Sequence, residues 1–224
     1  MKIFPYIQYF FYLGLNWNWR IAFHILWHEV KGEQKYGIHT TGSDELKKTA
    51  ATGVDISHAT VYMPASYLLL EQIFTKLPCN DRKHFLDIGC GKGRALCVAA
   101  HNGFQKVTGI EFSNEFCANA EENLRHTKKI FPSLDYSVIH KDAVTVDIPG
   151  DVDCIFFFNP FDQFMMRRVA KHIQESYKKN PRSIYIVYLN PLYKKELIQI
   201  GFKEIYYTKK MKYMEAMILH APGP

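Results

Sequence analysis

The chain has 224 residues, 47% of them hydrophobic, and a formal net charge of +6. This length and composition predict one large domain with a buried core and exclude a disordered or fibrous protein. The five cysteines form no CxxC pair and no cluster with histidine at the spacing of a zinc site, and no stretch has the pattern of a secretory signal. We therefore expect reduced thiols in a cytoplasmic protein and no bound metal.

Residues 1–30 are unusually aromatic, with three Trp and seven Phe or Tyr residues. Polar and charged residues, among them Arg20 and Glu29, interrupt this stretch well short of the roughly 20 apolar residues that a membrane span requires. We expect two amphipathic helices that are broken around residues 14–18, followed by a loop over residues 31–53. The helices are expected to pack on the core, to cover the active site or to lie on a membrane surface, in that order of preference.

Helical and strand patterns alternate through the rest of the chain. We assign residues 1–60 to a helical N-terminal extension with its loop and residues 61–224 to the main domain. The predicted helices cover residues 65–77, 94–101, 114–127, 163–179 and 192–200. The predicted strands cover residues 84–88, 106–111, 136–140, 154–158, 183–189, 202–207 and 213–220. This alternation predicts a three-layer α/β sandwich with a mostly parallel sheet, and the basic turn at residues 209–212 predicts that the last two strands form an antiparallel hairpin.

A glycine turn joins the first predicted strand to the next helix, in the segment FLDIGCGKGR at residues 85–94. Glycines at such a turn permit a positive φ and let a ligand approach the backbone. A dinucleotide-binding turn would have its third glycine at position 94, where this chain has Arg94. A phosphate-binding loop would end in Gly-Lys-Ser or Gly-Lys-Thr, which is also absent here. The spacing therefore fits neither NAD nor a nucleoside triphosphate.

Acidic residues stand at the carboxyl ends of three successive predicted strands. Asp87 would repel a pyrophosphate but suits a ligand that carries positive charge. Glu111 lies 18 residues beyond Gly93, where a carboxylate can accept hydrogen bonds from both ribose hydroxyls. Asp142 follows the third strand, at a position that can meet an adenine edge. Together they predict one crevice for a cationic nucleoside without phosphate.

These features resemble the class I S-adenosylmethionine-dependent methyltransferases, whose first motif is an acidic residue followed by Gly-x-Gly-x-Gly. Residues 87–93, DIGCGKG, match this motif throughout, and the resemblance extends over residues 62–220. It implies a Rossmann-like fold with an antiparallel final strand pair, S-adenosylmethionine as cofactor and methyl transfer as the reaction. The cofactor-binding residues that it implies are Asp87, Gly89, Cys90, Gly91, Gly93, Arg94, Glu111, Phe112, Asp142, Ala143 and Asn159.

Two short segments bear on the methyl acceptor. Asn159-Pro160-Phe161, directly after the fourth strand, resembles a shortened form of the Asn/Asp-Pro-Pro-Tyr/Phe motif of methyltransferases that modify nitrogen. The resemblance implies that Asn159 and the adjacent backbone carbonyl orient an amino group and that Phe161 stacks on it. Tyr62-Met63-Pro64 resembles the Tyr-x-Pro segment of non-SET protein lysine methyltransferases, which makes Tyr62 a candidate lid residue. The alternative is that Asn-Pro simply ends a strand with a turn and that Tyr62 is a packed aromatic residue.

Several functions share this cofactor. The first choice is a nitrogen methyltransferase acting on a protein side chain such as lysine. Residues 165–212 contain twelve Lys or Arg residues against three Glu, which favours an RNA or DNA base methyltransferase as one alternative. A small-molecule methyltransferase and a catalytically silent S-adenosylmethionine-binding module are the others, and a dehydrogenase ranks last.

Overall fold

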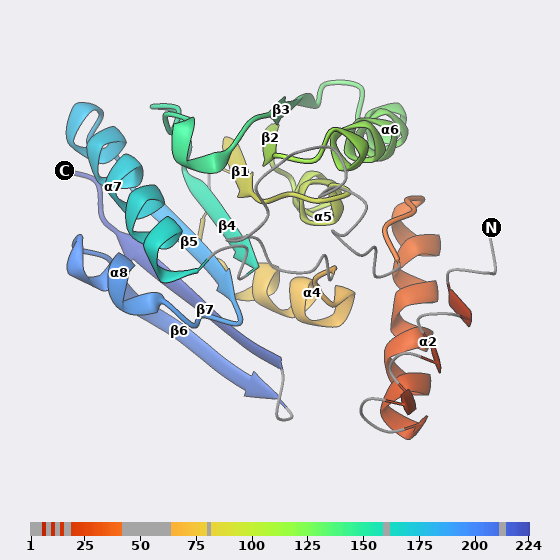
Figure 1. Ribbon diagram of the computed structural model, residues 1–224. Coiled ribbons are helices and arrows are strands. Elements are labelled where there is room, and N and C mark those ends of the chain that lie inside the picture. The colour runs from red at the N-terminus through yellow and green to blue at the C-terminus, as the bar shows by residue number, and fades with distance from the viewer. Residues whose placement is uncertain are drawn as a thin grey trace.

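The computed structural model describes residues 6–7, 10–11, 14–15, 19–41, 64–79, 82–158, 162–210 and 214–224 (Figure 1). The strands are β1 (His84–Ile88), β2 (Lys106–Glu111), β3 (Asp135–His140), β4 (Cys154–Phe158), β5 (Ile184–Leu189), β6 (Lys203–Lys210) and β7 (Met214–Ala221). The helices are α2 (Trp19–Tyr36), α4 (Tyr67–Lys76), α5 (Arg94–His101), α6 (Asn114–Ile130), α7 (Gln163–Lys179) and α8 (Lys194–Gln199), with a 3-10 turn η1 at Ala143–Thr145.

The seven strands form one sheet in the order β3-β2-β1-β4-β5-β7-β6. β1 pairs in parallel with β2 and β4, β2 with β3, and β4 with β5. β7 is antiparallel to both β5 and β6. Only three residues separate β6 from β7, too few for the crossover that a parallel pair needs. The predicted mostly parallel sheet with a C-terminal antiparallel hairpin is confirmed.

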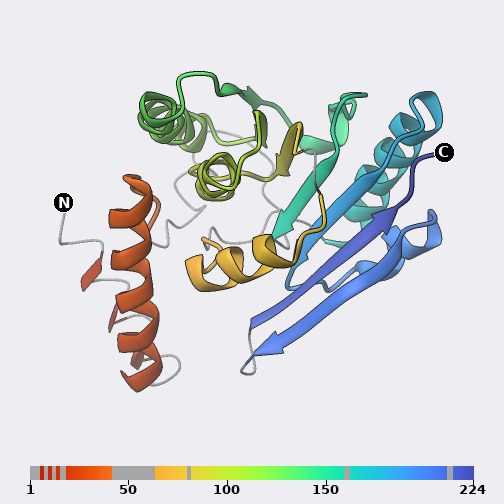
Figure 2. The same ribbon diagram turned by 180° about the vertical axis from the view of Figure 1, so that it is seen from behind.

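Helices cover both faces of this sheet, which makes three layers (Figures 1 and 2). Successive strand residues point to opposite faces. Phe85 packs in the core beneath α4, α5 and α6, whereas Leu86 packs in the second core beneath α7 and α8. Both side chains are fully buried. The sheet strands are thus apolar on both faces, as expected of a parallel sheet between two helical layers.

Helix α2 corrects one prediction, because it continues to Tyr36 where a loop was expected from residue 31. Glu29, Glu33 and Tyr36 are buried at helical spacing and form one face of the helix. Gly32 lies on the same face, and a side chain at this position would overlap the ring of Tyr67. The glycine that suggested a loop instead lets the helix backbone approach α4. No helix among the described residues has the length and apolar content to cross a bilayer.

Candidate active site

The glycine turn lies between the carboxyl end of β1 and the start of α5. Gly89, Gly91 and Gly93 have φ angles of 82°, 52° and 80°, in the left-handed region that favours glycine. The N–H groups of Gly89 and Cys90 both donate to the Ile110 carbonyl oxygen of β2, at 2.9 and 3.0 Å. The turn is therefore held against the neighbouring strand, at the carboxyl edge of the sheet where ligands bind in such folds.

Asp87 is a buried carboxylate whose charge is not balanced by a hydrogen-bond donor from the described part of the chain. Its residue is only 3% exposed, and no described residue donates a hydrogen bond to it. Burial, and then the nearby charge of Glu111, raise the pKa of Asp87 well above its usual range. Such a group is stabilised by a ligand that brings positive charge or N–H donors, which is what the α-ammonium of S-adenosylmethionine supplies.

Glu111 joins the end of β2 to the glycine turn. Its Oε2 accepts a hydrogen bond from the Gly91 N–H at 2.9 Å and its Oε1 accepts one from the Ser113 N–H at 2.9 Å. Burial raises the pKa of Glu111, while these backbone hydrogen bonds act in the opposite direction. The side chain therefore faces the turn, where a nucleoside held on the glycines would meet it. The carbonyl oxygen of the following residue, Phe112, accepts a hydrogen bond from His140 Nε2 at 2.8 Å.

The third acidic residue lies one strand further along the same edge. β3 pairs with β2 so that His140 is opposite Glu111, and Asp142 follows two residues later. The Asp142 carboxylate is exposed and accepts a hydrogen bond from the Val144 N–H at 3.1 Å, so it caps the 3-10 turn η1. Ala143 is buried beside it. The structure therefore brings Asp87, Glu111 and Asp142 to one edge of the sheet.

The predicted acceptor-side residues Tyr62, Asn159, Pro160 and Phe161 lie outside the described residues. Their neighbours are described, since β4 ends at Phe158 and the next helix, α7, is capped by Asp162. The roles assigned to these four residues stay predictions.

Arg94 makes its contacts with the protein itself. Its guanidinium donates to both Glu29 carboxylate oxygens, at 3.0 and 2.6 Å, and to the Ala65 carbonyl oxygen at 2.7 Å. It also donates to Thr40 Oγ1 at 2.7 Å and lies 4.0 Å from the centre of the Tyr67 ring. The side chain thus connects α2 and the segments at residues 40 and 65 to the first residue of α5. Its predicted part in cofactor binding stays a prediction.

Residues 85–180 match a family model described as a methyltransferase domain. Over these residues, which extend from β1 to the end of α7, the chain is similar to methyltransferases. The match includes the glycine turn and all three acidic strand ends. A search of curated protein sequences finds no match.

Solved structures share the fold of this chain at low sequence identity. An RNA methyltransferase from Salinibacter ruber in complex with S-adenosyl-L-homocysteine is 12% identical with a TM-score of 0.56, over 71% of this chain and 94% of that one. An S-adenosylmethionine-dependent O-methyltransferase from Thermotoga maritima is 16% identical with a TM-score of 0.53, over 73% and 68%. A magnesium protoporphyrin IX methyltransferase from Synechocystis with bound S-adenosylmethionine is 14% identical with a TM-score of 0.50, over 70% and 79%.

The sequence analysis missed several residues that hold the glycine turn in place. Glu29 and Thr40 bind Arg94, and the Asn123 side chain donates to the Lys92 carbonyl oxygen at 2.9 Å. These contacts cross between 31 and 65 residues of sequence, so no local pattern indicates them. Gly109 could have been identified from the sequence, because a glycine inside a strand often marks a place where another segment approaches the backbone closely. A Cβ there would lie 2.5 Å from Cys90 Sγ.

Proposed function

We propose that this methyltransferase transfers the methyl group to a nitrogen atom, with the amine of a protein lysine side chain as first choice. The observation that carries the proposal is the segment Asn159-Pro160-Phe161 at the end of β4. The Tyr62-Met63-Pro64 segment supports the choice of lysine by its resemblance to non-SET lysine methyltransferases.

The strand register supports a place for this segment beside the cofactor turn. β4 pairs in parallel with β1, with Phe156 opposite Asp87, so both strands end at the same edge of the sheet. Only three residues separate Phe158 from Asp162, whose Oδ1 accepts the Met165 N–H at 2.9 Å and fixes the start of α7. Phe158 and Asp162, which flank the segment, therefore bring the chain from this edge of the sheet to α7.

To catalyse methyl transfer, the protein has chiefly to align the amine with the methyl group and to exclude water from the site. Bound S-adenosylmethionine supplies a methyl group on a positively charged sulfur, which an amine lone pair can displace. Asn159 would accept hydrogen bonds from the amino group and aim its lone pair, and Phe161 would pack against it. An apolar aromatic site lowers the pKa of an amine, which favours the neutral form that has a free lone pair.

Ion pairing in the basic region weakens the case for a nucleic acid as acceptor. Each of the three acidic residues between positions 165 and 212 binds a basic residue of that region, in the pairs Arg167–Glu196, Lys171–Glu175 and Lys194–Glu204. Lys209 pairs with Glu215, and Arg182 donates to backbone carbonyl oxygens of residues 149, 152 and 180. Four of the twelve basic side chains are therefore paired with carboxylates, and the Arg182 guanidinium is engaged by the backbone, which reduces the positive charge that this region offers to phosphates.

The acceptor class can be determined by incubating the purified protein with methyl-labelled S-adenosylmethionine and fractionated lysate. We expect label in protein that survives nuclease and appears as methyllysine after hydrolysis. Label in RNA or in small molecules would refute the proposal.

All five cysteines are buried free thiols, which supports a further proposal that the enzyme acts in the cytoplasm. Localisation of a tagged chain outside the cytoplasm would contradict it.

Asn159 provides the second test. Substitution Asn159→Ala should lower turnover about 100-fold, because misplacing a reacting group by about 1 Å costs that much. The affinity for S-adenosylhomocysteine, measured by calorimetry, should change far less. Asn180→Ala, at the far end of α7, is the control and should retain full turnover. Equal turnover of Asn159→Ala and the wild type would remove this residue from the mechanism.

A further inference from the structure

Helix α2 and the segment before it expose a run of aromatic and apolar side chains. Trp19, Phe23 and Trp27 follow one another at intervals of four residues and are 47%, 63% and 52% exposed. Phe11 packs edge-on against Trp19, with ring centres 5.9 Å apart, and extends the run. Among the described residues, half of the twelve exposed large hydrophobic side chains lie between positions 7 and 27. Such clustering marks a contact surface, since isolated exposed apolar residues are ordinary.

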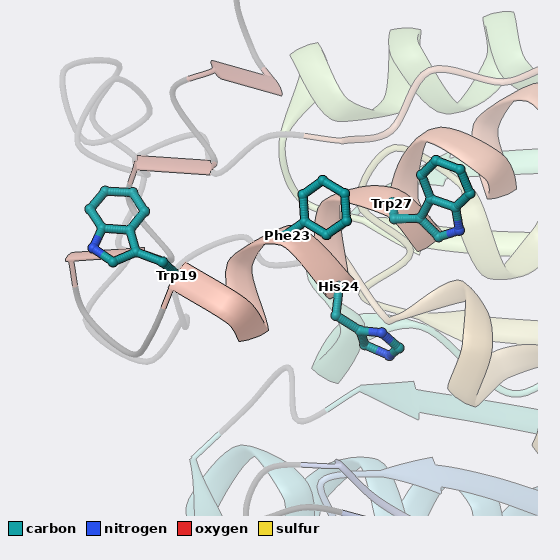
Figure 3. Close-up of a pocket in the computed structure, with 4 residues that line it drawn as sticks. All are labelled: Trp19, Phe23, His24 and Trp27. Atoms are coloured by element: carbon teal, nitrogen blue, oxygen red, sulfur yellow. The ribbon is translucent and has the colours of Figure 1, made fainter.

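The four residues Trp19, Phe23, His24 and Trp27 line an open hollow of about 640 Å³ (Figure 3). Phe23 and Trp27 lie together on one side of the helix, with ring centres 6.5 Å apart, and Trp19 lies at its first turn. We call Phe11, Trp19, Phe23 and Trp27 the aromatic face. Three of these residues belong to the N-terminal half of α2, and Phe11 belongs to the segment before it.

The charges of α2 are divided between its two sides. Its acidic residues are Glu29 and Glu33, and both are buried on the side toward the domain. Glu29 binds Arg94, and Glu33 accepts hydrogen bonds from the Tyr6 hydroxyl and the Thr40 N–H. In contrast, the exposed Lys31 ammonium lies 4.5 Å from the centre of the Trp27 ring. The outward side of the described helix is therefore aromatic and basic, with no acidic residue.

We propose that the aromatic face is a docking surface for a lipid bilayer that contains anionic headgroups. Trp and Phe side chains favour the boundary between headgroups and acyl chains, and nearby cations are attracted to anionic lipid. A helix of 18 residues lies along such a surface over about 27 Å without spanning it. Because the opposite side of α2 is fixed to α5 through Glu29 and Arg94, this contact would hold the catalytic domain at the membrane surface.

Tryptophan fluorescence tests the proposal directly, because all three tryptophans of the chain, Trp17, Trp19 and Trp27, lie in this segment. The full-length protein is mixed with vesicles of phosphatidylcholine alone or of phosphatidylcholine with phosphatidylglycerol. We expect a blue shift and quenching by brominated acyl chains with the anionic vesicles, weakened by high salt. An unchanged spectrum with anionic vesicles overturns the proposal, and so does an equal response to both vesicle types.

Co-sedimentation with the same vesicles identifies the residues. The triple substitution Trp19→Ala, Phe23→Ala and Trp27→Ala should weaken partition by at least about tenfold, because three apolar rings are lost. The control replaces Ile130, Leu192 and Ile205 by Ala, which are similarly exposed at 54%, 60% and 46% but lie elsewhere on the molecule. This control should partition like the wild type.

Two measurements distinguish docking to a bilayer from misfolding of the variant and from self-association of the chain. The triple variant should retain its affinity for S-adenosylhomocysteine and its thermal midpoint, which shows that only the surface has changed. Light scattering reports the oligomeric state of both proteins without lipid. A wild-type dimer that the triple substitution dissociates would mean that a second copy covers the aromatic face, and would refute docking to a bilayer.

Discussion

Substitution Glu29→Gln removes the counter-charge of a buried arginine. Both side chains of the Arg94–Glu29 pair are only 3% exposed, and their closest nitrogen and oxygen atoms are 2.6 Å apart. The glutamine keeps the size of the side chain and one hydrogen-bond acceptor, but it removes the carboxylate charge beside a guanidinium that is buried inside the protein.

The expected loss of stability is large for a single substitution. Removing one partner of a buried ion pair costs about 3–5 kcal/mol, and the retained acceptor places this case near the lower end. A loss of about 3 kcal/mol reduces the folding equilibrium constant by roughly 100-fold. With a urea dependence of about 3 kcal/mol per molar for a chain of this size, the unfolding midpoint should fall by about 1 M.

Urea unfolding followed by circular dichroism measures this change. The matched control is Glu175→Gln, which removes the exposed pair with Lys171 on α7 and should cost about 0.3–0.5 kcal/mol. The double substitution Glu29→Gln with Arg94→Gln should cost less than the sum of its parts, because each single substitution already breaks the pair. A Glu29→Gln variant as stable as the control, or additive single effects, would refute the ion pair as the link between α2 and the cofactor turn.

Three further predictions concern the cofactor turn. Because burial raises the folded-state pKa of Asp87, its carboxyl group stabilises the fold below its unfolded pKa near 4, and this contribution is lost as the pH rises through the raised value. Asp87→Asn should therefore raise the thermal midpoint of the ligand-free protein at neutral pH, by about 2–4 °C for each kcal/mol gained, while weakening S-adenosylhomocysteine binding in calorimetry; a lower midpoint with unchanged binding would contradict this. For the same reason, the affinity of the wild type for S-adenosylhomocysteine should increase with pH above about 4 until Asp87 is ionised, since the ligand ammonium favours the carboxylate, and Asp87→Asn should remove this dependence. Gly109→Ala should displace Cys90, whose Sγ lies 2.5 Å from the position of the new Cβ, and should weaken cofactor binding, whereas Gly201→Ala, where no atom lies within 4 Å of the added Cβ, should leave binding unchanged.

Local patterns in the sequence were sufficient to predict most of the fold. A parallel strand buried on both faces leaves a short continuous apolar run, and a helix on the sheet leaves apolar residues at helical spacing. The residues of β1, β2, β4, α5 and α7 are those predicted from these patterns. The glycine turn was also predictable from the sequence, because its three positive φ angles within five residues favour glycine. The order of Asp87, Glu111 and Asp142 along the chain predicted a common crevice, because parallel strands all end at one edge.

The tertiary structure alone decided which groups these residues meet. The Arg94 side chain, for example, binds Glu29, which lies 65 residues away in sequence. Residues 31–36 contain a glycine and were expected to form a loop, yet they continue α2 because the Tyr67 ring fills the space beside Gly32. The sequence also could not show that the two acidic residues of α2 are buried on the side toward the domain, because their partners are distant in sequence. A sequence records that a side chain is charged or small, but whether that charge is buried or that space is filled depends on segments that meet only when the chain has folded.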